Sequence, residues 1–125
     1  MERWVEAAVE RIETALEDRK AEGAVRGNAL RAETGLVHPA VIAAIAKGLG
    51  DREPLVTDAA IESLGQMRHR DALTALTKWG KRSRKALEKD TERMTAWIKA
   101  IGRHQDVDSL ELLAKDAFKQ GLEIS

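Results

Sequence analysis

Residues 56–79, VTDAAIESLGQMRHRDALTALTKW, decide the fold. The first half places apolar and small side chains three or four positions apart, at Val56, Ala60, Ser63 and Leu64. The second half does the same at Ala72, Leu73, Leu76 and Trp79. Positions with this spacing share one face of a helix, so the stretch predicts two short amphipathic helices joined by a tight turn. The small side chains of Ala59, Ala60 and Ser63 would let a neighbouring helix approach closely.

This pair resembles a HEAT-like repeat of the kind named after phycobilisome lyases. That repeat has a Val-x-x-x-Ala-x-x-Ala-Leu-Gly helix followed by an Ala-Leu-x-x-Leu helix. The matching positions here are Val56, Ala60, Ser63, Leu64 and Gly65, followed by Ala72, Leu73 and Leu76. The resemblance implies an α-solenoid, in which each helix pair buries its apolar face against the next pair.

Two poorer copies flank the central one, and the resemblance covers residues 25–118 in all. The earlier copy has one extra residue and carries Val25, Ala29, Ala32 and Gly35, then a helix that opens at His38-Pro39. The later copy carries Trp97, Ala100, Ile101 and Gly102, then Leu110 and Leu113. The marker glycines Gly35, Gly65 and Gly102 are 30 and 37 residues apart. Periods in this range are typical of helical arrays.

The remaining helices complete the predicted stack. A helix over residues 2–20 has one apolar stripe, which includes Trp4, and otherwise polar faces that suit an end cap. We expect the third pair to consist of one long helix over 83–101 and a final helix over 107–120, which Asp108 and Glu111 could cap. The sequence therefore predicts an all-α fold, a short right-handed α-solenoid of about three helix pairs plus an N-terminal capping helix. A compact, irregular helical bundle is the alternative.

Composition sets the outer bounds. The 125 residues form a single domain, 1–125, and 43% of them are apolar, which is enough for a genuine core. The sequence has no cysteine, which excludes disulfides and thiolate metal sites. No apolar run approaches about 20 residues, so we expect no membrane-spanning segment and no membrane partner. The charged start MERWVEAAVER does not resemble a signal peptide, so we expect a cytoplasmic protein, and we expect it to be a monomer.

The histidines and the known catalytic motifs do not predict an active site. His38, His69 and His104 each fall in the turn between two helices of a repeat. Stacked helices lie about 8–10 Å apart, while a metal needs ligands within about 2.1 Å, so we interpret these histidines as polar turn residues or N-caps. There is no HExxH motif, no glycine-rich phosphate loop and no His-Glu dipeptide like that of iron-binding HEAT-repeat hydroxylases. The sequence thus predicts no catalytic residue, no metal and no cofactor.

Charge is the most informative functional feature. The chain is neutral overall, but residues 66–104 carry a net charge of +7, while residues 1–22 and 105–125 each carry −3. The centre of the basic segment coincides with the residues that lengthen the third repeat. It contains Lys78, Lys81, Arg82, Arg84 and Lys85. Insertions in repeat proteins often form the binding face, which favours a binding role. Arg84 and Lys85 would also stand at the start of a helix, against the helix dipole.

Two functions follow from this surface. The first is a non-catalytic scaffold whose helical groove, with a basic rim, binds a protein partner that has an acidic segment. The second is nucleic-acid binding, in which the cations of residues 78–85 contact phosphates, as in the HEAT-like DNA repair glycosylases. Trp79 lies beside the run and could anchor an interface, but its apolar stripe favours a core position, as for Trp4 and Trp97.

Overall fold

The computed structural model describes residues 2–104, and within them the chain forms helices and no strand. The helices are α1 (Arg3–Glu17), α2 (Gly23–Arg31), α3 (Pro39–Ala46), the 3-10 helix η1 (Lys47–Gly50), α4 (Pro54–Gln66), α5 (Arg70–Arg82), α6 (Arg84–Glu88) and α7 (Thr91–Gly102). The prediction of an all-α fold is confirmed. The helix expected over 107–120, with its capping residues Asp108 and Glu111, lies outside the described residues.

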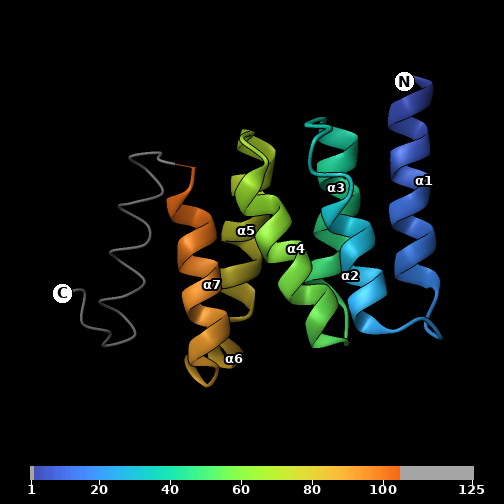
Figure 1. The fold of residues 1–125 in the computed structure, drawn as a ribbon. Helices are drawn as coiled ribbons and strands as arrows, with labels where there is room; N and C mark the ends of the chain where they lie inside the picture. Colours follow the sequence, from blue (N-terminus) through green and yellow to red (C-terminus); the bar gives the residue numbers. More distant parts are fainter. Residues whose placement is uncertain (1, 105–125) are drawn as a thin grey trace.

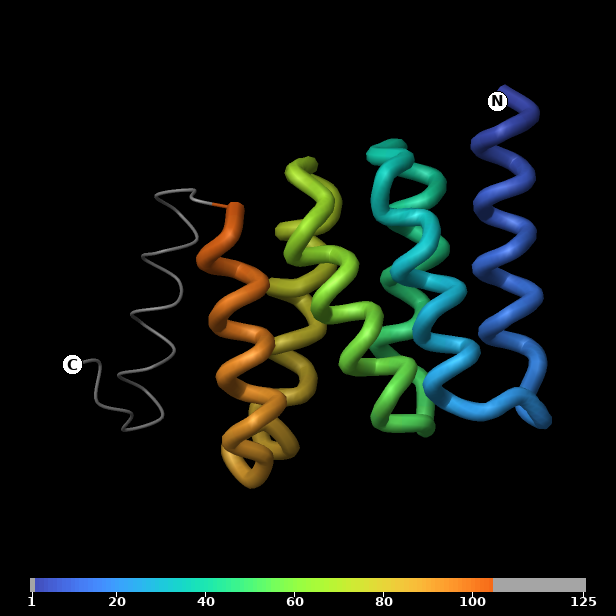
Figure 2. The backbone as a smooth tube through the Cα atoms, in the orientation of Figure 1, coloured from blue at the N-terminus to red at the C-terminus, as the bar shows by residue number. Residues whose placement is uncertain are grey.

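The helices stack side by side in two layers (Figures 1 and 2). Helices α2, α4 and α7 form one layer and run in the same direction, while α3 and α5 lie behind them and run the opposite way. Helix α1 closes one end of the stack by packing on α2 and α3. The α2/α3 and α4/α5 pairs are the two complete repeats, so the predicted α-solenoid with an N-terminal capping helix is confirmed. Its handedness stays a prediction.

Side chains fix the starts of several helices. The Nδ1 atoms of His38 and His69 each accept a hydrogen bond from the backbone N–H two residues on, at 3.0 Å in both cases. These bonds satisfy first-turn N–H groups that have no partner within the helix. The interpretation of these two histidines as N-caps is therefore confirmed. His104 instead places its Nε2 3.1 Å from the carbonyl oxygen of Leu64, at the end of α4.

The central repeat meets the third repeat through a close, apolar contact, which we call the dry joint. Leu64 and Leu76 are fully buried, as the spacing predicted. A Cβ atom on Gly65 would lie 2.8 Å from the Cβ of Ala100, so only glycine lets α4 and α7 approach this closely. Gly80 lies directly under the indole ring of Trp97, whose Nε1–H donates to the carbonyl oxygen of Leu76 at 2.9 Å.

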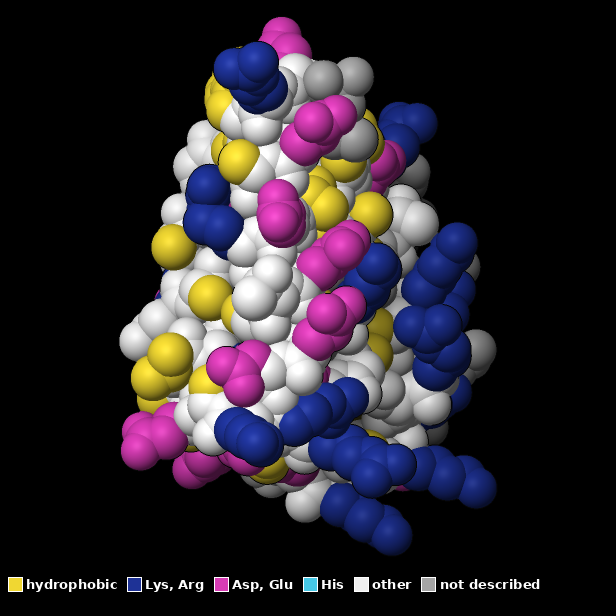
Figure 3. Space-filling view, turned by 90° about the vertical axis from the view of Figure 1, so that its right-hand side faces the viewer, with side chains coloured by type: hydrophobic (Ala, Val, Ile, Leu, Met, Phe, Trp, Pro, Cys, Tyr) yellow, Lys and Arg dark blue, Asp and Glu magenta, His cyan; other side chains and the backbone are white. Residues whose placement is uncertain are grey.

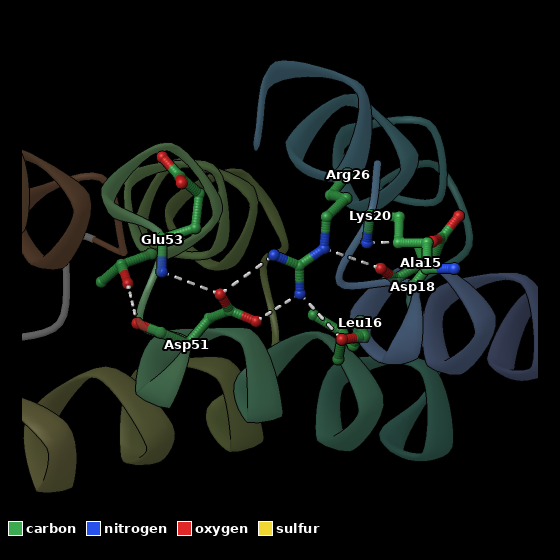
Figure 4. Close-up of polar contacts among 8 residues, drawn as sticks. Ala15, Leu16, Asp18, Lys20, Arg26, Asp51 and Glu53 are labelled. Atoms are coloured by element: carbon green, nitrogen blue, oxygen red, sulfur yellow. Dashed lines mark hydrogen bonds and ion pairs between the residues drawn. The ribbon is translucent and has the colours of Figure 1, made fainter. Parts of the chain in front are cut away.

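The first repeat meets α1 through buried charge, which we call the polar joint (Figure 4). Arg26 is only 4% exposed. Its Nε and one terminal nitrogen donate to the carbonyl oxygens of Ala15 and Leu16 at 3.0 and 2.7 Å, at the end of α1. The guanidinium also forms a two-bond ion pair with Asp51, at 2.6 and 3.2 Å. Asp51 in turn accepts the backbone N–H of Glu53 at 2.9 Å, which ties the turn before α4 to the same group.

A second ion pair completes the polar joint. Glu33, just after α2, is 9% exposed and accepts two hydrogen bonds from Arg11 of α1, at 2.7 and 3.0 Å. These hydrogen bonds and the carboxylate charge raise the pKa of Arg11 above its ordinary value. Both ends of the joint therefore connect the capping helix to the first repeat through arginine–carboxylate pairs.

The polar joint also corrects the predicted register of the first repeat. Arg26, Leu30 and Glu33 are buried, whereas Val25 is 59% exposed and Ala32 is exposed. Arg26, Leu30, Glu33 and Gly35 have the same spacing as Val56, Ala60, Ser63 and Gly65. The register with an extra residue was therefore wrong by one position, because apolar side chains were assigned to sites that charged ones occupy.

Two further expectations were wrong. The single helix over 83–101 is two helices, because Asp90 accepts the backbone N–H of Arg93 at 3.0 Å and so starts α7 anew. Trp4 is 60% exposed rather than in the core. Helix α1 has neighbours on one side only, and that side is filled by Val5, Ala8 and Ile12. Its outward side carries a line of acidic side chains (Figure 3).

Candidate binding surfaces

The predicted basic run lies at the junction of α5 and α6. Lys78, Lys81 and Arg82 belong to the second half of α5, while Arg84 and Lys85 open α6. We call this set of five residues the α5–α6 basic surface. All of its members are exposed except Arg84, which is partly buried. Arg84 places its Nε 3.8 Å from Oε1 of Glu88, one helical turn on.

Helix α6 is held firmly in place although it has only five residues. Leu87 at its centre is 1% exposed and belongs to the same core as the repeats. The residues that lengthen the third repeat thus form a packed helix that presents its cations on a fixed backbone.

The predicted conflict with the helix dipole is small. Helix α6 has little more than one turn, and Arg84 has Glu88 as a neighbour of opposite charge. Lys81 and Arg82 lie in the last turn of α5, where positive charge is favourable. Among residues 2–104, no carboxylate oxygen lies within 4.0 Å of Lys78, Lys81, Arg82 or Lys85. Within that part of the chain, these four cations are therefore available to a ligand.

Trp79 does not take part in this surface. Its side chain is 7% exposed and packs in the core, as does that of Trp97, which is 2% exposed. The expected core position of both tryptophans is confirmed. An anchor for a partner would need an accessible ring, which Trp79 does not offer.

A second candidate surface, which the sequence did not predict, is a groove of about 520 Å³ in the layer of α2, α4 and α7. It is lined mostly by charged side chains: Arg31, Asp58, Glu62, Asp90, Glu92, Arg93, Lys99 and Arg103. Two ion pairs tie its walls together, Arg31–Glu62 at 2.9 Å and Arg93–Asp58 at 3.0 Å. None of the five residues of the α5–α6 basic surface lines the groove.

One sequence signal could have located this groove. Glu92, Ala96, Lys99 and Arg103 are separated by four, three and four residues, which places them on one face of α7. Their polar character hides them from a search for apolar stripes. Asp58 and Glu62 face them from α4, whose register was predicted, but Arg31 comes from α2, whose predicted register was wrong by one position. The concavity itself therefore could not be predicted.

The described residues offer no arrangement that suggests a metal centre. Within residues 2–104 no group of three or more histidine, aspartate or glutamate side chains is placed to hold an ion. No helix among them is both long enough and apolar enough to cross a membrane.

Comparison with known proteins identifies the repeats. The family model described as HEAT repeats matches residues 9–92, from the middle of α1 to the start of α7. Searches of curated proteins and of solved structures gave no match. HEAT repeats commonly serve as protein-interaction scaffolds, and their fold is typically non-catalytic. The phycobilisome-lyase type of repeat stays a prediction.

Proposed function

The chain belongs to the HEAT-repeat family, and from this premise we propose that it is a non-catalytic scaffold that binds an acidic segment of a partner protein through the α5–α6 basic surface. The observation that carries this proposal is the inserted helix α6. It departs from the regular repeat, packs firmly through Leu87 and continues the line of cations that begins on α5.

The insertion supports a binding role because the first repeat has no counterpart of α6. Gly35 and Gly65 are 30 residues apart, and only the four-residue 3-10 helix η1, which directly continues α3, stands between α3 and α4. Gly65 and Gly102 are 37 residues apart, and α6 lies within this longer interval. In repeat proteins, such additions commonly lie on one face and carry the function.

The charge of the surface defines the partner. Lys78, Lys81, Arg82 and Lys85 have no carboxylate partner within residues 2–104, so an acidic segment would not have to displace one there. Exposed ion pairs contribute at most about 1 kcal/mol each, so affinity must come from several contacts made together. Salt screens such contacts, and binding should weaken as ionic strength rises.

The test uses a glutamate-rich peptide as the acidic probe. We expect the triple variant Lys81→Ala, Arg82→Ala, Lys85→Ala to bind it about tenfold or more weakly than the parent chain, because three contacts are lost. Arg84 is left in place because it neighbours Glu88. The matched control removes three exposed cations elsewhere, with Arg3→Ala, Lys20→Ala and Arg68→Ala, and should keep the affinity within about twofold.

A DNA duplex separates the scaffold from the nucleic-acid alternative. A phosphate-binding surface would retain the duplex at low salt and lose it with a log–log salt slope near −0.9 per phosphate contact. Retention of this kind, abolished by the triple variant, would favour the nucleic-acid alternative. Equal peptide binding by the parent and triple variants would show that the basic run is only a solvated surface.

A further inference from the structure

We propose that the groove between α2, α4 and α7 is a second binding site, which takes an extended peptide carrying a cationic residue and an acidic residue about three to five positions apart. This site lies apart from the α5–α6 basic surface and does not depend on the function proposed for it. Its volume of about 520 Å³ is within the range of pockets that hold small ligands.

The groove has two ends of opposite charge. Helices α2, α4 and α7 run in the same direction (Figures 1 and 2), so their first residues lie at one end of the groove and their last residues at the other. The first end is acidic, with Asp58, Asp90 and Glu92 around the single cation Arg93. The other end is basic, with Arg31, Lys99 and Arg103 around the single carboxylate Glu62.

The internal ion pairs leave a smaller set of groups for a ligand. Arg31 is bound to Glu62 and Arg93 to Asp58, and Arg93 also donates to the carbonyl oxygen of Pro54 at 3.3 Å. Among residues 2–104, Glu92, Lys99 and Arg103 are within 4.0 Å of no group of opposite charge. Asp90 likewise has no cation within 4.0 Å among these residues, although its Oδ1 accepts the backbone N–H of Arg93 at 3.0 Å. A ligand therefore meets two carboxylates, Asp90 and Glu92, at the acidic end and two available cations at the basic end.

The geometry of α7 sets the spacing of the ligand. Glu92 and Lys99 are seven residues apart, or about 10.5 Å along the helix, and Glu92 and Arg103 are eleven apart, or about 16.5 Å. An extended chain advances about 3.3–3.6 Å per residue, so matching charges on a peptide would be roughly three to five residues apart. The small side chains of Ala96 and Ala100 line the groove between these charges and leave room for a backbone.

The test compares eight-residue peptides of zero net charge. Each has one lysine and one glutamate in a glycine–serine chain, placed one, four or seven residues apart. We expect the peptide with a four-residue separation to bind at least about threefold more tightly than the other two. In an NMR titration, its binding should shift the amide signals of residues 92–103 and leave those of residues 78–85 unchanged.

The variant Glu92→Lys gives the decisive comparison. It should lower the affinity for the peptide whose charges are four residues apart by about fivefold or more, because a lysine at this position would repel the peptide lysine that Glu92 attracts. The same variant should bind a peptide with two glutamates more tightly than the parent chain does. Lys89→Glu is the control, since Lys89 is exposed just before α7 and does not line the groove. The affinity of the Lys89→Glu variant for the peptide whose charges are four residues apart should stay within about twofold of that of the parent chain.

Three results would overturn the inference. Equal affinity for all three spacings would mean that the groove does not measure the distance between charges. Unchanged binding by Glu92→Lys would mean that the charges at the two ends of α7 only complement the helix dipole and do not contact the peptide. Loss of binding in the triple variant of the α5–α6 basic surface, but not in Glu92→Lys, would place the peptide there instead.

Discussion

Two of the joints in the stack, the polar joint at α1 and the dry joint at α7, differ in what is buried at their centres. At the dry joint, Gly65 and Ala100 let α4 and α7 touch through small apolar groups. At the polar joint, the buried guanidinium of Arg26 bonds to Asp51 and to two carbonyl oxygens of α1. The difference shows that a buried position of the repeat can hold charge when its neighbour supplies unsatisfied polar groups.

The end of α1 supplies those groups. The last carbonyls of a helix have no partner within it and must be satisfied from outside. Arg26 satisfies two of them, while Asp51 balances its charge. At the dry joint, Ala100 instead packs directly against the backbone of Gly65. Buried ionic hydrogen bonds therefore add to the apolar packing of the capping helix, whereas at the third repeat the ion pair Arg93–Asp58 lies at the edge and the centre of the contact is apolar.

The largest expected effect comes from removing the charge at the polar joint. Arg26→Met should lower the free energy of unfolding by about 3–5 kcal/mol, because the buried Asp51 carboxylate loses its cation and two helix carbonyls lose their donor. The free energy is measured by urea unfolding.

The matched control makes the same substitution in the same helix. Arg31 pairs with Glu62, but both side chains are about half-exposed, so Arg31→Met should cost at most about 1 kcal/mol. Equal losses in the two variants would show that burial does not distinguish the two pairs, and the contrast between the joints would fail.

The next largest effect concerns the core beside the dry joint. Leu64→Ala and Leu76→Ala should each lower the free energy of unfolding by about 2–5 kcal/mol, because both side chains are fully buried and a cavity would remain. Leu55 in α4 is 50% exposed, and Leu55→Ala should change the free energy by no more than about 0.5 kcal/mol. Losses below about 1 kcal/mol at both buried leucines would mean that the core repacks freely.

A smaller effect tests the close approach itself. Gly65→Ala should cost about 1–3 kcal/mol, because the added methyl group would meet Ala100 and force α4 and α7 apart. Gly35 occupies the same repeat position, but a methyl group added there would meet no atom of the described residues within 4 Å. Gly35→Ala should therefore be neutral or stabilising by about 0.4–1 kcal/mol. Thermal unfolding of both variants measures the difference, and equal losses would contradict it.

The sequence predicted the dry joint well and the polar joint poorly. Val56, Leu64 and Leu76 follow apolar helical spacing, and their burial could be predicted from that spacing alone. Arg26 and Glu33 occupy the repeat positions of Val56 and Ser63, but charged residues are almost never buried unless they are paired, so their burial was not expected. Their partners, Asp51 and Arg11, are 25 and 22 residues away in the sequence. No local pattern links residues at that distance.

The candidate surfaces divide in the same way. The α5–α6 basic surface could be predicted because its cations are close together in the sequence and coincide with an irregular repeat interval. The break before α7 was missed, although Asp90 is a favourable N-cap residue. The groove depends on residues from three helices, and its shape follows only when their register is fixed.

The smallest expected effect is the response to acid, which should separate the two joints without any change in packing. Burial alone would raise the pKa of Asp51, but hydrogen bonds from Arg26 and from the Glu53 N–H, with the charges of Arg26 and Arg19, lower it below its ordinary value. A carboxylate with a lowered folded-state pKa contributes stability that is fully present above its unfolded pKa, about 3.9, and is lost as the pH falls through the folded value. The difference in free energy of unfolding between the parent chain and Asp51→Asn should therefore be constant from pH 7 to about pH 5 and shrink below about pH 4. Because other carboxylates titrate in the same range, this difference is the quantity to follow, and amide exchange should show α1 losing protection before α4. A difference that stays constant down to about pH 2.5, well below the unfolded pKa, would show that the charge of Asp51 does not hold the capping helix.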